Sequence, residues 1–188
     1  MDFSKLIRTS VQAIAPYSSA RDEFSGPVRV ALDANESPFQ DEEQADINRY
    51  PDPYQMELKG AISKVSGVPV AEIFLGNGSD EALDVLLKTV ADPGVDEVVV
   101  PNPSFGMYKV LAIEQGLIIK VAHLNENLDL KPAAIKPLLS PHTKVVFICS
   151  PNNPTGKSVP LKSLVEIAES TKGLVVVDEA YIDRKSVV

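Results

Sequence analysis

The stretch Lys144–Asp178, KVVFICSPNNPTGKSVPLKSLVEIAESTKGLVVVD, decides the fold. It begins with one apolar run, Lys144–Cys149, and ends with another, Leu174–Asp178, and residues with helical spacing, Leu161–Thr171, lie between them. Both runs are apolar at consecutive positions rather than at alternate ones, which is typical of strands that are covered on both faces in a parallel sheet. The order strand, helix, strand therefore predicts an α/β fold.

The same alternation extends from this stretch toward the N-terminus. Apolar runs predict further strands at Glu72–Leu75, Glu97–Val100 and Leu117–Leu124. Helical spacing predicts further helices at Leu58–Val65, Ala82–Val90, Ser104–Gln115 and Leu130–Leu139. Strand and helix thus alternate five times, and we expect a mostly parallel sheet with helices on both faces.

Residues 1–53 are irregular by comparison. The apolar residues of Phe3–Ile14 have the spacing of one short amphipathic helix. The stretch Pro16–Pro53 is punctuated by prolines and contains one short apolar alternation, Val28–Leu32. We interpret 1–53 as an N-terminal arm or connector and 54–188 as part of a large domain.

Composition excludes several classes of protein. The 188 residues include 18 Lys and Arg against 26 Asp and Glu, a net charge of −8, which disfavours sequence-independent binding of nucleic acid or anionic membranes. Cys149 is the only cysteine, so an intrachain disulfide is impossible. His123 and His142 have no metal-ligand spacing, so we expect no metal site. We expect no targeting or membrane-spanning segment and a reducing, cytoplasmic location.

Unusual residues follow three of the predicted strands, at Gly76–Ser79, Ser150–Gly156 and Asp178–Tyr181. Ligands of open α/β sheets bind beyond the carboxyl ends of the strands, so we expect these segments along one edge. The first can present helical N–H groups to an anion. Its alternative role is a plain turn in which Ser79 caps the helix.

The other two segments offer side-chain groups. Asn152 and Asn153 can donate amide N–H groups to a ligand. Alternatively, these amides bond within their own loop, as in an ordinary loop rich in Asx residues and proline. Asp178 follows four apolar residues, so its carboxylate needs a partner: a cationic ligand atom, a metal, or a lysine or arginine. Its alternative role is to cap the next turn. Together the three segments suit a phosphorylated heteroaromatic compound with a ring nitrogen.

Six motifs in this order resemble a known family. They are DANESPF (33–39), NRYPDPY (48–54), GNGSDEALDVL (76–86), PNPSFGMY (101–108), SPNNPTGK (150–157) and VVVDEAY (175–181). The resemblance is to the N-terminal half of the fold-type-I, pyridoxal-5′-phosphate-dependent aminotransferases, and it runs from about Tyr17 to Asp183. APYSSARDE (15–23) and RYPDPY (49–54) are most similar to the histidinol-phosphate branch of that family.

The resemblance implies a large domain with three layers and assigns roles to its residues. Asp178 would pair with the pyridine nitrogen of the cofactor, and Asn153 and Tyr181 would donate to its phenolate oxygen. Phe105 would stack on its ring. The turn with Ser79, Asp80 and Glu81 would hold its phosphate through backbone N–H groups.

Three further residues are implied to act at the same site. Tyr50 would reach the phosphate from the second subunit of a homodimer, and Tyr17 and Asn35 would line the substrate side. The implied reaction moves an amino group between L-histidinol phosphate and 2-oxoglutarate, a step of histidine biosynthesis in the cytoplasm.

The resemblance also implies what this chain lacks. The Schiff-base lysine and the small C-terminal domain of the family would follow position 188, and Lys185 reads as an exposed terminal lysine. We therefore expect no catalytic lysine in the chain and no activity of the chain alone. Two alternatives stay open: another fold-type-I aminotransferase or a phosphothreonine decarboxylase, and a remnant that binds without catalysis.

Overall fold

The structure of the chain is a computed structural model that describes residues 3–18, 26–27, 30, 32–39 and 47–183. The chain divides into two compact units: Met1–Ala13 with Gly76–Val188, and Ile14–Leu75. The larger unit contains the whole β-sheet, and the smaller one contains the helix α2 (Met56–Ser66). The assignment of 1–53 to an arm and of 54–188 to a large domain stays a prediction.

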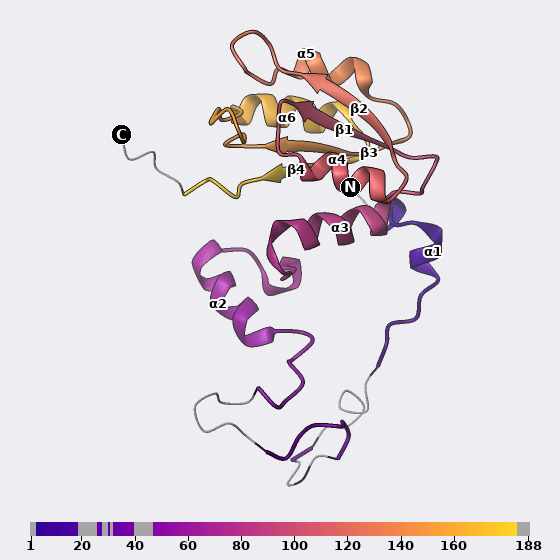
Figure 1. The fold of residues 1–188 in the computed structure, drawn as a ribbon, viewed down its shortest axis with the longest axis vertical. Coiled ribbons are helices and arrows are strands. Elements are labelled where there is room, and N and C mark those ends of the chain that lie inside the picture. The colour runs from indigo at the N-terminus through magenta and orange to yellow at the C-terminus, as the bar shows by residue number, and fades with distance from the viewer. Residues whose placement is uncertain (1–2, 19–25, 28–29, 31, 40–46, 184–188) are drawn as a thin grey trace. The chain divides into compact units, whose positions relative to one another are not determined.

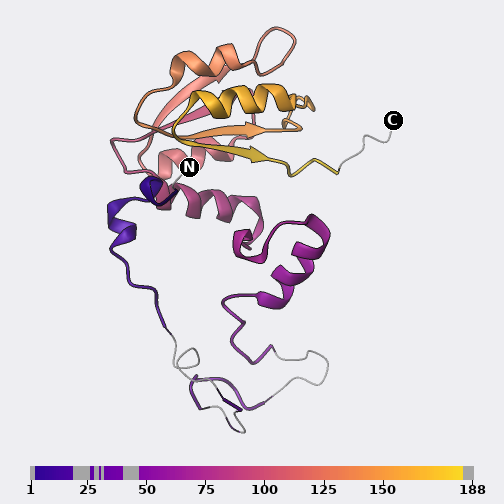
Figure 2. The same cartoon turned by 180° about the vertical axis from the view of Figure 1, so that it is seen from behind.

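A four-stranded parallel sheet forms the centre of the larger unit (Figures 1 and 2). Its strands are β1 (Glu97–Asn102), β2 (Ile118–His123), β3 (Thr143–Cys149) and β4 (Leu174–Asp178). Their spatial order is β2-β1-β3-β4, so β1 and β3 are the central strands. The α/β prediction is confirmed, and so are the four predicted strands that begin at or after Glu97.

Helices cover both faces of this sheet (Figure 1). They are α3 (Gly78–Val90), α4 (Met107–Glu114), α5 (Pro132–Ile135) with the 3₁₀ helix η3 (Lys136–Leu138), and α6 (Leu161–Ser170). α3 and α4 share one apolar cluster with β1 and β3, whereas α5 and α6 share a second cluster with the opposite face. The larger unit therefore has three layers, as expected.

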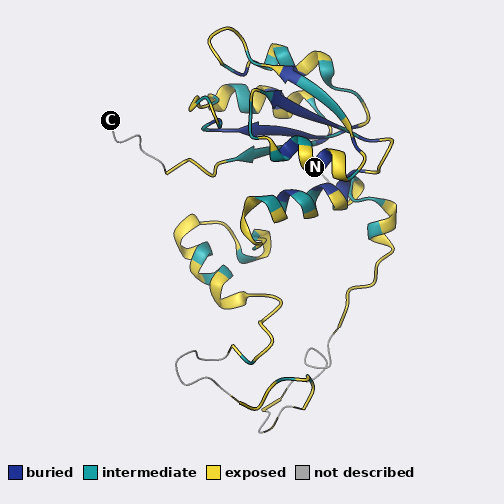
Figure 3. Ribbon diagram, in the orientation of Figure 1, coloured by how far each residue is buried: buried dark blue, intermediate teal, exposed yellow. Residues whose placement is uncertain are grey.

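β3 shows why the sheet needs cover on both sides. Its residues Val145, Phe147 and Cys149 pack into the cluster with α3 and α4. Val146 and Ile148 pack into the cluster with α5 and α6. All five are buried, and Figure 3 shows the central strands as the most enclosed part of this unit. Burying each such side chain stabilises the fold by about 1.5–3 kcal/mol, so exposing either face would be costly.

The N-terminal segment forms two short pieces instead of the one predicted helix. They are the 3₁₀ helix η1 (Phe3–Leu6) and the helix α1 (Thr9–Gln12). Arg8 between them is extended, and its backbone N–H donates to the carbonyl oxygen of Thr89 at 2.9 Å. Its guanidinium donates to the carbonyl oxygen of Lys88 at 3.0 Å and to Asp92 at 2.7 Å. The helix is interrupted because the backbone N–H of Arg8 bonds to the end of α3 rather than to a carbonyl of its own segment.

The smaller unit corrects one sequence prediction. α2 ends at Ser66, one residue after the helix predicted at Leu58–Val65, but Glu72–Leu75 is no strand. Val70–Glu72 is instead a 3₁₀ helix, η2, and residues 73–75 have no regular structure. The apolar run fits a strand locally, but an isolated strand is unstable without a neighbour to take up its backbone hydrogen bonds. The chain therefore has four strands among its described residues.

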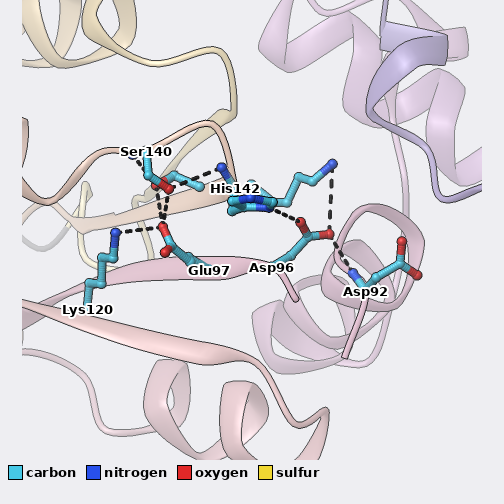
Figure 4. A network of polar contacts seen from close by, with 8 residues as sticks. Asp92, Asp96, Glu97, Lys120, Ser140 and His142 are labelled. Carbon is cyan, nitrogen blue, oxygen red and sulfur yellow. Dashed lines mark hydrogen bonds and ion pairs between the residues drawn. The ribbon is translucent and has the colours of Figure 1, made fainter. Parts of the chain in front are cut away.

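A polar network lies at the amino ends of β1 and β3 (Figure 4). A carboxylate oxygen of Glu97 accepts hydrogen bonds from Lys120 Nζ at 2.7 Å, from Ser140 Oγ at 2.5 Å and from Thr143 Oγ1 at 3.2 Å. Burial by itself would raise the pKa of Glu97, but these donors and the charge of Lys120 outweigh it and lower that pKa. The network therefore ties the start of β1 to its neighbours in the sheet.

Glu97 should make the fold sensitive to acid. Because its pKa is lowered by folding, its contribution is complete above the unfolded pKa of about 4.3 and is lost as the pH falls through the folded pKa. We expect Glu97→Gln to lower the free energy of unfolding by about 1–3 kcal/mol at neutral pH and to weaken the decrease of that free energy as the pH falls through the folded pKa of Glu97. Urea unfolding at several pH values measures both. Glu114→Gln, an exposed site on α4, is the control, and an unaltered pH profile in Glu97→Gln would contradict the prediction.

Candidate functional site

A cavity of about 260 Å³ lies at the carboxyl edge of the sheet. Its lining comes from the start of α3, from the loop before α4 and from the ends of β3 and β4: Asn77, Gly78, Ser79, Asp80, Phe105, Cys149, Asp178, Ala180 and Tyr181. The volume is close to the lower end of the roughly 300–1,000 Å³ that small-molecule sites occupy. Two of the three segments expected along one edge, Gly76–Ser79 and Asp178–Tyr181, thus line a single cavity, whereas no residue of Ser150–Gly156 does.

Asp178 is the last residue of β4 and is half-buried at the cavity. Its Oδ2 accepts a hydrogen bond from the phenol of Tyr108 at 2.7 Å, and its Oδ1 accepts one from the backbone N–H of Ala180 at 3.0 Å. Among the described residues, the partners of this carboxylate are therefore a phenol and the backbone N–H of the next turn, as in the capping role considered from sequence, and not a lysine or arginine. A carboxylate has about four acceptor positions, so Asp178 can accept another donor from a ligand.

Tyr108 is held firmly in the core beneath this carboxylate. Its ring is fully buried and stacks on Phe147, with 4.8 Å between centroids and 2° between planes. The ring of Phe105 meets it edge-on at 5.5 Å and 84°. Burial raises the pKa of Tyr108, and the hydrogen bond to Asp178 raises it further, so the phenol stays neutral and donates.

Sequence reasoning missed Tyr108. The motif PNPSFGMY includes it, but no role was assigned to it. The available signal was its position, three residues after Phe105 and at the start of a helix, which places both side chains near one another. Its bond to Asp178 joins residues 70 positions apart, which no local pattern reveals.

Asn153 and Tyr181, which the resemblance assigns to the same cofactor oxygen, are hydrogen-bonded to each other. Asn153 Nδ2 donates to the phenol oxygen of Tyr181 at 3.3 Å, and Tyr181 lines the cavity. The neighbouring Asn152 has a structural role instead, because it is buried and its amide bonds to Ser104 Oγ at 2.7 Å and to Thr155 Oγ1 at 2.9 Å. The self-satisfied loop considered from sequence holds only for the bond from Asn152 to Thr155, because Asn152 also bonds to Ser104 and Pro103 of a distant loop.

The turn before α3 brings a helix N-terminus to the cavity. Gly78 has φ 76°, a left-handed conformation that favours glycine, and its N–H donates to the carbonyl oxygen of Gly76 at 2.9 Å. Glu81 turns its carboxylate back to the backbone and side-chain amides of Asn77, so its side chain is taken up within the turn. The next N–H groups, of Ser79 and Asp80, belong to the first helical turn and have no partner within the helix.

Asp80 has a buried carboxylate oxygen, Oδ1, without a hydrogen-bond partner in the described part of the chain. Such atoms are uncommon in native proteins. Because Asp80 lines the cavity, a donor from a ligand or from a water molecule could satisfy this oxygen.

Other chemistry finds less support in the structure. Cys149 is buried, and its thiol lies 3.2 Å from the carbonyl oxygen of Pro151. Within the described residues, no group of three or more His, Cys, Asp or Glu side chains could hold a metal ion. No helix in the same part of the chain is long and apolar enough to cross a membrane.

Three residues given roles at the site belong to the smaller unit. Tyr17, Asn35 and Tyr50 are all exposed, and their assigned roles stay predictions. Lys185, expected to be an exposed terminal lysine, lies outside the described residues.

Comparison with known protein families matches residues 18–184 to the family described as Aminotransferase class I and II. The chain belongs to this family. The resemblance expected from the six motifs is thereby confirmed. Members of this family of pyridoxal-phosphate-dependent aminotransferases share the arrangement of sheet and helices seen here.

Two relatives illustrate the similarity. The chain is 46% identical over 182 residues to the Histidinol-phosphate aminotransferase of Parabacteroides distasonis, covering 97% of this chain and 52% of the relative. It is 43% identical over 178 residues to the Histidinol-phosphate aminotransferase of Cytophaga hutchinsonii, covering 95% of this chain and 51% of the relative. The chain therefore spans about half the length of these relatives.

A solved structure supports the fold. The histidinol-phosphate aminotransferase of Sinorhizobium meliloti, in complex with pyridoxal-5′-phosphate, matches with a TM-score of 0.66 and 23% identity. The match covers 71% of this chain and 37% of that one. At this identity the likeness establishes the shared fold alone.

The cavity fits the cofactor of this family. Pyridoxal phosphate carries a phosphate, a ring nitrogen and a phenolate oxygen. At the cavity, the N-terminus of α3 can bind an anion, and the carboxylate of Asp178 can accept a hydrogen bond from a ring N–H. The amide–phenol pair of Asn153 and Tyr181 can serve the phenolate oxygen, and Phe105 supplies an aromatic ring at the cavity wall.

Removal of the Tyr108 hydroxyl should weaken the larger unit. Tyr108→Phe keeps the ring stacked on Phe147 but leaves Asp178 Oδ2 without its buried donor. We expect the free energy of unfolding to fall by about 1–3 kcal/mol, measured by urea unfolding. Tyr54→Phe, at an exposed tyrosine, is the control. Equal stability of Tyr108→Phe and the unaltered chain would show that this hydrogen bond contributes nothing.

Proposed function

We propose that this chain is the cofactor-binding part of an aminotransferase that acts on L-histidinol phosphate and 2-oxoglutarate. The observation that carries the proposal is the carboxylate of Asp178, held by Tyr108 and facing a cavity that also contains the first turn of α3. The identity to relatives named Histidinol-phosphate aminotransferase supports this choice within the family. Because the chain spans about half of those relatives, the activity belongs to the whole protein in this proposal.

Asp178 is the residue that would control the chemistry. Bound pyridoxal phosphate supplies an electron sink, which is stronger when its ring nitrogen carries a proton. The Asp178 carboxylate would hold that proton at the nitrogen through a charge-assisted hydrogen bond. Tyr108 would keep the carboxylate oriented, because its stacked and buried ring cannot swing away.

The remaining residues of the cavity would bind and orient the ring. Asn153 and Tyr181 would donate to the phenolate oxygen, and Phe105 would pack against the ring face. The backbone N–H groups at Ser79, Asp80 and Glu81 would hold the phosphate. Glu81 would contribute only its backbone, since its carboxylate is bonded to Asn77.

The smaller unit would complete the site in a homodimer. In this proposal Tyr50 reaches the cofactor phosphate of the second subunit, and Tyr17 and Asn35 line the substrate side. The exposure of all three side chains is compatible with contacts to another molecule. The lone, buried Cys149 thiol is consistent with a reducing cytoplasmic location.

Cofactor binding by the 188-residue chain tests the proposal. We expect pyridoxal phosphate to bind, with a change in its absorbance spectrum, and Asp178→Asn to weaken binding at least about tenfold, or about 1.4 kcal/mol. Asp183→Asn is the matched control, because Asp183 is an exposed aspartate of the same segment. Failure of the unaltered chain to bind, or equal binding by Asp178→Asn, would refute the proposed cofactor site.

The substrate is tested separately, in a protein of the relatives' full length that carries residues 1–188. Amino transfer to 2-oxoglutarate should be faster from L-histidinol phosphate than from L-aspartate or L-phosphothreonine. A preference for L-aspartate would point to another aminotransferase, and release of carbon dioxide from L-phosphothreonine would point to a decarboxylase.

A further inference from the structure

Glu36 holds together two sequence motifs of the smaller unit. One oxygen of its carboxylate, Oε2, accepts from Arg49 Nη1 at 2.8 Å. The other, Oε1, accepts from the backbone N–H of Tyr50 at 2.9 Å. Glu36 lies in the motif DANESPF, and Arg49 and Tyr50 lie in the motif NRYPDPY. One side chain thus joins segments that are 13 and 14 residues apart.

The burial of this carboxylate shows that the contact is more than a surface ion pair. The Glu36 side chain is only 6% exposed, although that of Arg49 is 51% exposed. No described residue of Ile14–Leu75 is buried when all of its atoms are counted. The Glu36 carboxylate is nevertheless enclosed. An enclosed charge is costly unless it is paired and hydrogen-bonded, and Glu36 therefore favours the arrangement in which both donors stay in place.

A second contact joins the same two segments. Asn48 Nδ2 donates to the carbonyl oxygen of Ser37 at 2.8 Å. Asn48 Oδ1 is buried and has no hydrogen-bond partner among the described residues. Two consecutive residues of one motif, Glu36 and Ser37, are thereby bonded to three consecutive residues of the other.

We propose that Glu36 is a positioning residue that fixes the backbone of Tyr50, and so sets where its phenol reaches the cofactor phosphate. This inference rests on the proposed function, in which Tyr50 acts on that phosphate. Glu36 directly follows Asn35, the residue proposed for the substrate side. We call the contacts of Glu36 with Arg49 and with the backbone of Tyr50 the clamp. The clamp joins the segment of Asn35, on the proposed substrate side, to the segment of Tyr50, on the proposed phosphate side.

The clamp itself is measured by hydrogen exchange of the Tyr50 amide in the 188-residue chain. Glu36→Ala removes both acceptors, and we expect the Tyr50 amide to exchange at least about tenfold faster. Glu36→Gln retains an oxygen for this amide but loses the ion pair with Arg49, so its exchange should be intermediate. Glu57→Ala, at an exposed glutamate on α2 of the same unit, is the control.

A double-mutant cycle between Glu36→Ala and Tyr50→Phe tests the role at the phosphate. Each variant should weaken binding of pyridoxal phosphate about tenfold. The double variant should bind it no more weakly than Tyr50→Phe alone, because both changes remove the same contact between the Tyr50 phenol and the phosphate. Binding of pyridoxal, which lacks the phosphate, should be unaffected in all three. A general loss of structure would instead weaken both ligands, and its effects would add.

The outcomes separate this inference from the proposed function. Absence of pyridoxal phosphate binding by the unaltered chain would overturn the proposed function, and with it the role of Tyr50 on which this inference rests. Binding that weakens in Tyr50→Phe but not in Glu36→Ala would overturn the role of Glu36 and leave the proposed function intact. Equal Tyr50 exchange in Glu36→Ala and Glu57→Ala would overturn the clamp directly.

Discussion

Burial of β3 on both faces is the constraint on which the rest of the larger unit depends. Its alternate side chains enter two separate apolar clusters, one with α3 and α4 and one with α5 and α6. A strand of this kind is stable only between two helical layers, and helices that connect parallel strands on both faces supply those layers. Parallel strands also end at one edge, which is why loops distant in sequence meet around the cavity.

The site continues this core rather than lying on top of it. Phe147 belongs to β3, Tyr108 stacks on it, and Phe105 meets Tyr108 at the cavity wall. The ring of Tyr108 is buried in close packing and has little freedom to move, and its hydroxyl donates to Asp178. The orientation of the carboxylate thus depends on aromatic packing, and the chemistry proposed for it depends on that orientation.

The smaller unit is stabilised by other interactions than those that stabilise the sheet. None of its described residues is buried, so apolar packing cannot fix its loops. Polar contacts take that role: Glu36 bonds to Arg49 and Tyr50, and Asn48 bonds to the segment after Glu36. Each of these contacts is directional, so the local geometry depends on a few atoms, whereas that of the sheet depends on many small contacts.

Local and periodic features of this protein follow from the order of its amino acids. The apolar runs indicated four of the strands, and the residues after the last of them indicated the edge at which Asp178 and Tyr181 now line a cavity. The pairing of groups from distant segments became visible only in the folded chain. The strand expected at Glu72–Leu75 lacks a neighbour, the helix expected at Phe3–Ile14 is broken by the contacts of Arg8, and Tyr108 reaches Asp178 across 70 positions. Hydrophobic periodicity indicates which secondary structure a segment can form locally. The contacts named here depend on distant segments, whose positions are set only when the sheet and its helices pack.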